Sequence, residues 1–232
     1  MTMTVLTIDT STKYASVSLM LEDGNRFCSS WYTDQNHGAE LMVEINKIAD
    51  ESKITLDSLS HITVCIGPGG FSAIRTGISV TLGLAMGTKS TLCGVNTHVL
   101  EAWNHTKIAD QEIISILPAS KTLFSWALIN SNQPTKILDT GLDDLNTIKN
   151  FKNSVLFCGE SSVELKGKIN EERIVTKALP SRDPNILLDL SKIAIKNKSY
   201  CEAKDLRPIY SRPPNISKPK NISPTWSHFN DD

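Results

Sequence analysis

The chain has 232 residues, of which 40% are hydrophobic and 21% are charged, and its formal net charge is −1. This composition is typical of a soluble, globular protein with one large domain or two lobes. Proteins that bind nucleic acid without the help of a partner protein usually carry a clear surplus of Lys and Arg. The balanced charge argues against that class, and any RNA would be held largely through a partner.

Cysteine usage and the N-terminus restrict the protein class further. The five cysteines are far apart and form no CxxC pair, so neither a zinc cage nor a disulfide framework is expected. The N-terminus has no basic stretch followed by a long apolar core, which argues against a signal peptide. The apolar run from Ile78 to Met86 is too short to span a bilayer. We expect a cytoplasmic protein without membrane contact.

In chain order, the first half reads as three strands followed by alternating helices and strands. Apolar and alternating runs predict an antiparallel meander over residues 5–8, 15–21 and 26–33. Leu41, Ile45 and Ile48 recur on one face of a helix. Next come a buried strand at 62–66, a second helix, a strand at 91–95, and a helix from Thr97 to about Lys107. This order is the pattern of ribonuclease-H-like folds.

The second half repeats this order loosely, which suggests a duplication. Strands are predicted at 113–117, 123–129, 137–138, 155–158 and 174–175, with helices at 143–149, from 161, and at 186–196. Proline then becomes frequent among basic residues, which excludes a packed helix or a central strand. We expect an N-terminal lobe at 1–105, a C-terminal lobe at 106–206, and a Pro-rich basic tail at 207–232. The tail reads either as a solvated segment or as a docking strap.

The stretch GPGGFSAIRTGISVTLGLAMG, residues 67–87, is the most informative part of the chain. It lacks the Gly-Lys-Ser/Thr ending of a Walker A loop and the third glycine of a GxGxxG fingerprint. Its helical part instead spaces Ser79, Gly83 and Gly87 by four residues, which places small side chains along one face. The pattern favours a packing helix entered through a sharp turn. Internal packing, contact with a partner chain and direct phosphate binding remain three readings of it.

Polar residues elsewhere give weaker signals. Asp9, Ser11 and Thr12 follow the first strand, where they fit either an ordinary polar turn or a remnant of a phosphate loop. The histidines show no HxxxH or HExxH pair, and no GxSxG elbow is present. We therefore expect no catalytic residues and no metal ligands.

Four segments together resemble the TsaB family, also called YeaZ. They are IDTST at 8–12, HGAEL at 37–41, the glycine-rich stretch at 67–87, and PIYSR at 208–212, which is similar to the closing PxYLR of the family. The resemblance is strong over residues 4–100 and weak over about 105–200. It implies an α/β, two-lobed fold of the actin-like/hsp70 type, in which each lobe is a mixed sheet flanked by helices.

The resemblance also implies a function. Members of the family are non-catalytic scaffolds that activate the paralogue TsaD by dimerising with it, and TsaD adds threonylcarbamoyl to N6 of adenosine 37 in tRNAs reading codons that start with A. An ATPase, TsaE, completes the assembly. The chain would therefore need no cofactor of its own, with ATP and Mg²⁺ handled by partner subunits, and it would meet tRNA indirectly. The partner interface, or a homodimer when TsaD is absent, would use the first two helices. Carried onto this sequence, that interface comprises His37, Leu41, Ile45, Phe71, Ile74, Arg75 and Ile78.

The chain departs from the family in one segment. An IDAR sequence usually begins the second lobe, whereas this chain has Leu117-Pro118-Ala119-Ser120 at that point. Any role of that loop in nucleotide contact is thereby put in doubt. The main alternative function is a small ATPase or kinase of the actin-like fold that would use Asp9. A peptidase, a label once attached to this superfamily, would need metal-ligand spacing that the sequence does not show.

Overall fold

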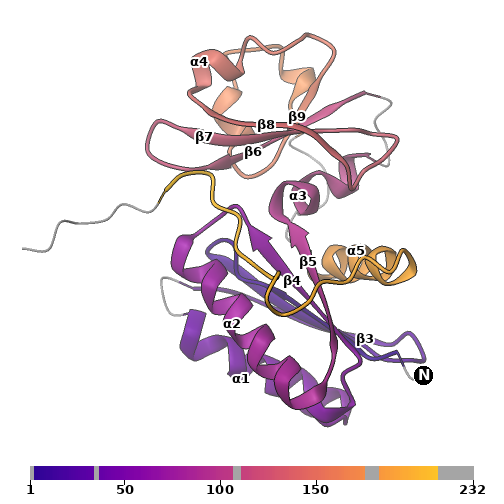
Figure 1. The fold of residues 1–232 in the computed structure, drawn as a ribbon. Coiled ribbons are helices and arrows are strands. Elements are labelled where there is room, and N and C mark those ends of the chain that lie inside the picture. The colour runs from indigo at the N-terminus through magenta and orange to yellow at the C-terminus, as the bar shows by residue number, and fades with distance from the viewer. Residues whose placement is uncertain (1–2, 34–36, 107–110, 176–182, 214–232) are drawn as a thin grey trace, which may run out of the picture.

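The structure is a computed structural model of the 232-residue chain, and it describes residues 3–33, 37–106, 111–175 and 183–213. The predicted end of a helix at Lys107 and most of the predicted tail, residues 214–232, lie outside these ranges. Two sheets lie at opposite ends of the molecule with one helix between them (Figure 1). This arrangement confirms the two-lobed α/β fold.

The first sheet has five strands in the order β3-β2-β1-β4-β5. Strands β1 (Val5–Asp9), β2 (Tyr14–Met20) and β3 (Arg26–Tyr32) form the predicted antiparallel meander. Strands β4 (His61–Gly67) and β5 (Thr91–Asn96) run parallel to β1, as expected when helices connect neighbouring strands. The sheet is therefore mixed, with a hairpin edge and a parallel edge.

Helices α1 (His37–Ser52) and α2 (Phe71–Thr88) cover one face of this sheet (Figure 1). Their apolar stripes meet Leu6 and Ile8 of β1 in one continuous core. The buried helix residues are Leu41, Ile45 and Ile48 of α1 together with Ile74 and Ile78 of α2. The predicted apolar face of the first helix is thus confirmed, because the 3.6-residue period brings these side chains onto the sheet.

The second sheet has the order β8-β7-β6-β9, which matches the order of the first four strands of the first sheet. Its strands are β6 (Ile113–Pro118), β7 (Phe124–Ile129), β8 (Ile137–Asp143) and β9 (Leu156–Cys158). The first two junctions are antiparallel and β6 pairs with β9 in parallel, as β1 does with β4. This repeat of topology supports the predicted duplication.

The helices of the second lobe are much shorter than those of the first. The helix α4 spans only Leu145–Ile148, and the predicted helix from residue 161 is a 3₁₀ turn, Ser162–Leu165. A second 3₁₀ turn, Glu171–Arg173, leads to a single parallel bridge between Ile174 and Phe157, where an edge strand was predicted. Glycines with positive φ at Gly159 and Gly167 bound the first turn, so no amphipathic run is long enough there to form an α-helix.

The helix α3 (Thr97–Thr106) joins the two lobes and contacts both sheets. Its buried His98 ring bridges two hydroxyls of the second sheet, since Nδ1 lies 3.0 Å from the Oγ of Ser115 and Nε2 lies 3.0 Å from the Oγ of Ser125. The side chain of Asn96, rather than the predicted Thr97, accepts the N–H of His98 at 2.8 Å at the start of the helix. A buried polar bridge of this kind fixes how the helix sits against the second sheet.

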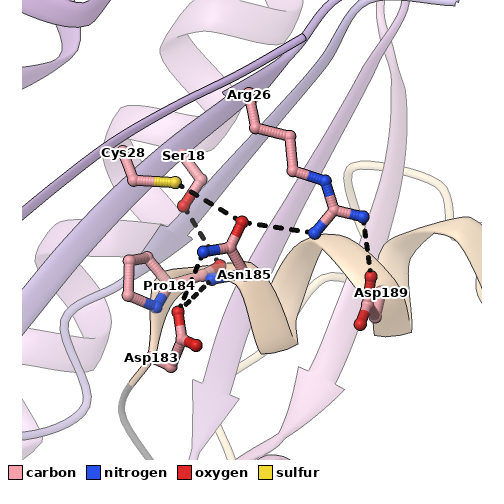
Figure 2. Close-up of polar contacts among 7 residues, drawn as sticks. All are labelled: Ser18, Arg26, Cys28, Asp183, Pro184, Asn185 and Asp189. Carbon is pink, nitrogen blue, oxygen red and sulfur yellow. Dashed lines mark hydrogen bonds and ion pairs between the residues drawn. The ribbon is translucent and has the colours of Figure 1, made fainter. Parts of the chain in front are cut away.

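The last helix, α5 (Pro184–Lys196), returns to the first sheet and covers the face opposite α1 and α2. Figure 2 shows its polar attachment, in which Arg26 of β3 donates to Asn185 at 3.2 Å and pairs with Asp189 at 3.0 Å. Ser18 of β2 donates to the carbonyl of Pro184 at 3.1 Å. The predicted assignment of 106–206 to a C-terminal lobe therefore does not describe α5, because its apolar residues complete the core of the first lobe.

The glycines of α2 differ in their surroundings, and this difference gives a direct test of the packing. An added Cβ at Gly77 would lie 2.5 Å from the Oγ1 of Thr10, whereas one at Gly83 would meet nothing within 4 Å. We expect Gly77→Ala to lower the free energy of unfolding by about 1–2 kcal/mol. The matched Gly83→Ala should raise it by about 0.5–1 kcal/mol through helix propensity. Urea denaturation of both variants checks this, and equal effects would contradict the packing.

Candidate functional site

A cleft of about 830 Å³ lies between the two lobes. Its walls come from six parts of the chain that are far apart in sequence. These parts are the turn after β1 at 11–13, the start of α1 at 37–38, the glycine-rich loop and first turns of α2 at 68–76, the end of β6 at 117–119, Glu160 after β9, and the C-terminal segment at 210–213. In an α/β fold of this kind, a crevice at the carboxyl ends of the strands is the place where a ligand would be sought.

The turn after β1 is closed by its own hydrogen bonds. The carboxylate of Asp9 is buried, and its Oδ1 accepts the backbone N–H of Ser11 at 2.9 Å and the Ser11 hydroxyl at 2.6 Å. Thr12 sits at the cleft wall, where its hydroxyl accepts the N–H of Tyr14 at 3.2 Å. This geometry is that of a polar turn satisfied by short side chains. Asp9, Ser11 and Thr12, the predicted remnant of a phosphate loop, thus lie together. The Asp9 carboxylate, however, accepts hydrogen bonds from its own turn.

The glycine-rich loop packs against this turn. The N–H of Gly70 donates to the carbonyl of Ser11 at 2.8 Å, and the hydroxyl of Thr10 donates to the carbonyl of Ala73 at 2.7 Å. Added Cβ atoms at Gly67 or Gly69 would collide with backbone atoms of Ile209 or Ser11. These glycines therefore allow two backbone segments of the same chain to lie close together. This supports internal packing, the first of the three interpretations of the motif. A phosphate cradle would need the Gly70 amide that Ser11 already engages.

The corresponding loop of the second lobe is also closed. The N–H groups of Ala119 and Ser120 both donate to the carbonyl of Leu123, at 3.0 Å and 2.9 Å. The Ser120 hydroxyl accepts the N–H of Leu123 at 3.0 Å. Pro118 ends β6 at the cleft where the family pattern has an acidic residue. This loop therefore lacks the carboxylate of the family pattern, and the carboxylate that the second lobe places at the cleft is Glu160, which follows β9.

The C-terminal segment crosses the first lobe to reach the cleft. Its Leu206 is buried in the main core, and the N–H of Ile209 donates to the carbonyl of Ile66 at 2.7 Å. Tyr210 then stacks on Phe71 with ring centroids 4.5 Å apart and accepts a 2.6 Å hydrogen bond from the Nε of Arg75. The described part of the predicted tail, residues 207–213, is thus a strap fixed to α2. The sequence signalled this contact only through the family-like PIYSR segment.

The structure corrects four of the seven residues predicted for a partner interface. Leu41, Ile45 and Ile74 have no exposed surface and Ile78 is 5% exposed, so these side chains pack inside the chain and cannot form a docking surface. His37 lines the cleft, and its Nε2 lies 2.9 Å from the carbonyl oxygen of Thr12. Among the seven, Arg75 is exposed and Phe71 is half-buried, and the two are held together by a cation–π contact of 3.9 Å.

The outward side of α2 is open and carries unusually small residues. Ser79, Gly83, Met86 and Gly87 are all exposed and recur at the spacing of one helical face. Added Cβ atoms at Gly83 and Gly87 would meet no atom of the described parts of the chain within 4 Å outside the helix itself, and Met86 is 86% exposed. We call these four residues the α2 outer face. Sequence reasoning found its small-residue spacing but missed Met86, which the period of the same helix could have indicated.

Thiol or metal chemistry finds no support in the described residues. Burial, followed by the nearby Glu101 carboxylate, raises the pKa of the Cys158 thiol well above its ordinary value, and burial raises the pKa of Cys93 to about 11. No group of three or more His, Cys, Asp or Glu in the described parts of the chain could hold a metal ion. Likewise, no helix within those parts is long and apolar enough to cross a membrane.

Comparisons with known proteins give a consistent family. The model of the TsaD family, described as tRNA N6-adenosine threonylcarbamoyltransferase, matches residues 32–182, which is more than half of the chain. The tRNA threonylcarbamoyladenosine biosynthesis protein TsaB of Buchnera aphidicola subsp. Baizongia pistaciae is 26% identical over 133 residues, covering 56% of this chain and 59% of that protein. The Escherichia coli protein of the same name is 30% identical over 95 residues, covering 41% of each chain. The chain thus spans about half the length of the curated relatives it matches.

Solved structures extend the similarity over nearly the whole fold. YeaZ from Pseudomonas aeruginosa superimposes with a TM-score of 0.76 at 20% identity, covering 90% of this chain and 99% of that one. At 20% identity this match establishes the fold only. Membership of the family is shown by the sequence matches. The chain belongs to the family of the TsaD model, and within it the chain is a TsaB/YeaZ-type protein.

Proposed function

We propose that the chain acts in the biosynthesis of threonylcarbamoyladenosine on tRNA, as a subunit that binds and activates a TsaD-type enzyme without doing the chemistry itself. The proposal is supported by the names of its relatives, which are called tRNA threonylcarbamoyladenosine biosynthesis proteins. It also agrees with a cleft whose two loops are closed by internal hydrogen bonds. The substrate tRNAs would be those that read codons starting with A.

The observation that carries the proposal is the α2 outer face. Glycine inside a helix is unfavourable by roughly 0.5–1 kcal/mol relative to alanine. At Gly77 this cost is explained by the close approach of Thr10, but at Gly83 and Gly87 no neighbour among the described residues explains it. A second backbone that packs closely against the helix would account for both glycines, with Met86 as an apolar anchor.

The same surface fits the dimerisation that we propose. A TsaD-type paralogue would dock on the α2 outer face, and a second copy of this chain would occupy it when the paralogue is absent. Arg75 and Phe71 lie at the start of the same helix and would border the contact. A TsaE-type ATPase would join through the complex, which would also bring the tRNA, and ATP with Mg²⁺ would be handled by those partner subunits.

A direct test of the surface uses matched exposed positions. We expect Met86→Glu and Gly83→Arg to weaken association with the organism's own TsaD-type enzyme by at least tenfold, because each places a charge or bulk in a close contact. Multi-angle light scattering and titration calorimetry measure this. Val163→Glu is the control, since Val163 is 49% exposed but lies in the second lobe. Wild-type affinity in both α2 variants would show that the enzyme docks elsewhere.

A second prediction concerns the reaction itself. Threonylcarbamoyl-adenylate, ATP, unmodified tRNA and the TsaD- and TsaE-type proteins should yield modified adenosine only when this chain is added. Met86→Glu should reduce the yield in proportion to its loss of binding, whereas Val163→Glu should not. Mass spectrometry of nuclease-digested tRNA gives the readout. Equal modification without the chain would refute the proposed role.

A third prediction separates the scaffold from the alternative ATPase. Asp9→Ala removes the acceptor of two hydrogen bonds in a buried turn and should lower the free energy of unfolding by about 1–3 kcal/mol. In this proposal the Asp9 carboxylate serves only to stabilise the turn through Ser11. ATP turnover by the isolated chain should therefore be absent before and after the substitution. Urea denaturation and a phosphate-release assay check the two parts. Turnover that Asp9→Ala abolishes would favour the ATPase.

A further inference from the structure

We propose that Tyr14 and Tyr32, with Lys13 beside them, form a stacking platform for unpaired RNA bases. We call these three residues the tyrosine platform. The inference rests on the proposed function for the identity of the RNA as tRNA and for the enzyme that completes the complex in the first test. It assigns this chain a direct contact with RNA, where sequence reasoning expected only an indirect one.

The platform is defined by two large exposed rings. Tyr14 is 61% exposed and Tyr32 is 57% exposed, which are high values for side chains within strands. The two residues are register partners of β2 and β3, and their rings meet edge to face at 70° with centroids 5.5 Å apart. The ammonium of Lys13 lies 5.9 Å from the centre of the Tyr32 ring and 3.5 Å from its hydroxyl. Two exposed rings and a cation are thus gathered where β2 begins and β3 ends.

The platform lies on the face of the first sheet opposite α1 and α2. Along β3, Trp31 donates to Glu40 of α1 at 2.9 Å, whereas Cys28 contacts Asn185 of α5 at 3.8 Å. Because side chains alternate between the two faces of a strand, Tyr32 shares the face of Cys28. Figure 2 shows that face, with α5 lying across it. An RNA on the platform and an enzyme on the α2 outer face would therefore not compete.

The chemistry favours RNA over a second protein. Protein interfaces bury large apolar side chains around their aromatic anchors, but none of the exposed large aliphatic side chains described in the structure lies beside the tyrosines. Val43 and Met86 lie on α1 and α2, Leu138 and Val163 lie in the second lobe, and Ile209 lies in the C-terminal segment. Beside the tyrosines, β3 instead exposes the small polar Ser30. Aromatic faces next to a cation are the usual means of holding unpaired bases, since every base has a face that stacks and each phosphate is attracted to the cation.

The location suits a looped RNA that also reaches the cleft. Lys13 is both a member of the platform and part of the cleft wall, and the backbone N–H of Tyr14 is held by the Thr12 hydroxyl at that wall. A base stacked on the rings would therefore lie at the mouth of the cleft. Two rings suit one or two unpaired bases, as an anticodon loop offers, and a base-paired stem has no free face to stack.

The test measures binding of fluorescently labelled, unmodified tRNA to the assembled complex with the TsaD-type enzyme, at fixed salt. The double variant Tyr14→Ala/Tyr32→Ala should weaken binding by roughly fivefold to a hundredfold. Tyr14→Phe/Tyr32→Phe keeps the stacking faces and should bind nearly as the wild type does. Tyr200→Ala is the control, because Tyr200 is 43% exposed but its ring contacts His61 on another part of the surface. Fluorescence anisotropy gives the affinities.

Several results would overturn the platform. Unchanged affinity in the double alanine variant would do so, and so would equal loss in the phenylalanine variant, which would indicate hydrogen bonding rather than stacking. Loss of enzyme association in a folded double alanine variant would make the pair a protein contact instead.

A second measurement does not depend on the enzyme. Single-stranded RNA containing 4-thiouridine is cross-linked to the full chain alone, and the modified peptides are identified by mass spectrometry. Cross-links at Tyr14 or Tyr32 support the platform, and their absence or restriction to other residues opposes it. A failed proposed function would instead appear as a loss of enzyme binding or of tRNA modification, with these cross-links intact.

Discussion

The structure depends on the close contact between the turn after β1 and the start of α2. The carbonyl of Ser11 and the hydroxyl of Thr10 bond to backbone groups of the glycine-rich stretch, at Gly70 and Ala73. Side chains at Gly69 or Gly77 would prevent this approach. The contact sets the direction in which α2 leaves β4, and thereby decides which residues of α2 enter the core and which face outward. The same few hydrogen bonds thus hold the glycine-rich loop against the turn after β1 and orient α2 so that its outer face is exposed.

Closure of the cleft loops and openness of the helix surface fit a protein that works by contact. Enzymes of two-lobed folds need polar groups that are free to meet a ligand. Here the carboxylate of Asp9 and the hydroxyl of Ser120 serve their own turns. The exposed glycines of α2 have no such internal use. Cleft loops that bond internally and a helix face that stays exposed agree with the proposed role as a scaffold.

Much of the fold could be predicted because hydrophobic periods of two and of 3.6 residues mark the strands and helices of the first lobe. The second lobe was less predictable, since its helices are single turns, one of them enclosed by Gly159 and Gly167, and leave no periodic run. The prediction of Leu41 and Ile74 as interface residues was wrong because it was carried over from the family resemblance, which names the two helices but not the face of each that the sheet covers. The strap contact of Tyr210 with Arg75 joins residues far apart in sequence, which no local pattern reveals.

The return of α5 to the first sheet makes the second sheet an insertion within the first lobe. α3 and α5 pack against each other, and α5 with Leu206 completes the core on which α2 rests. Residues 1–105 alone would leave that core open, so this lobe cannot be isolated as one continuous fragment. A single internal deletion between Thr106 and Pro184 could nevertheless remove the second sheet while keeping α2 in place. Evolution can therefore shorten or reshape the inserted half of this chain without disturbing the surface where a partner would dock.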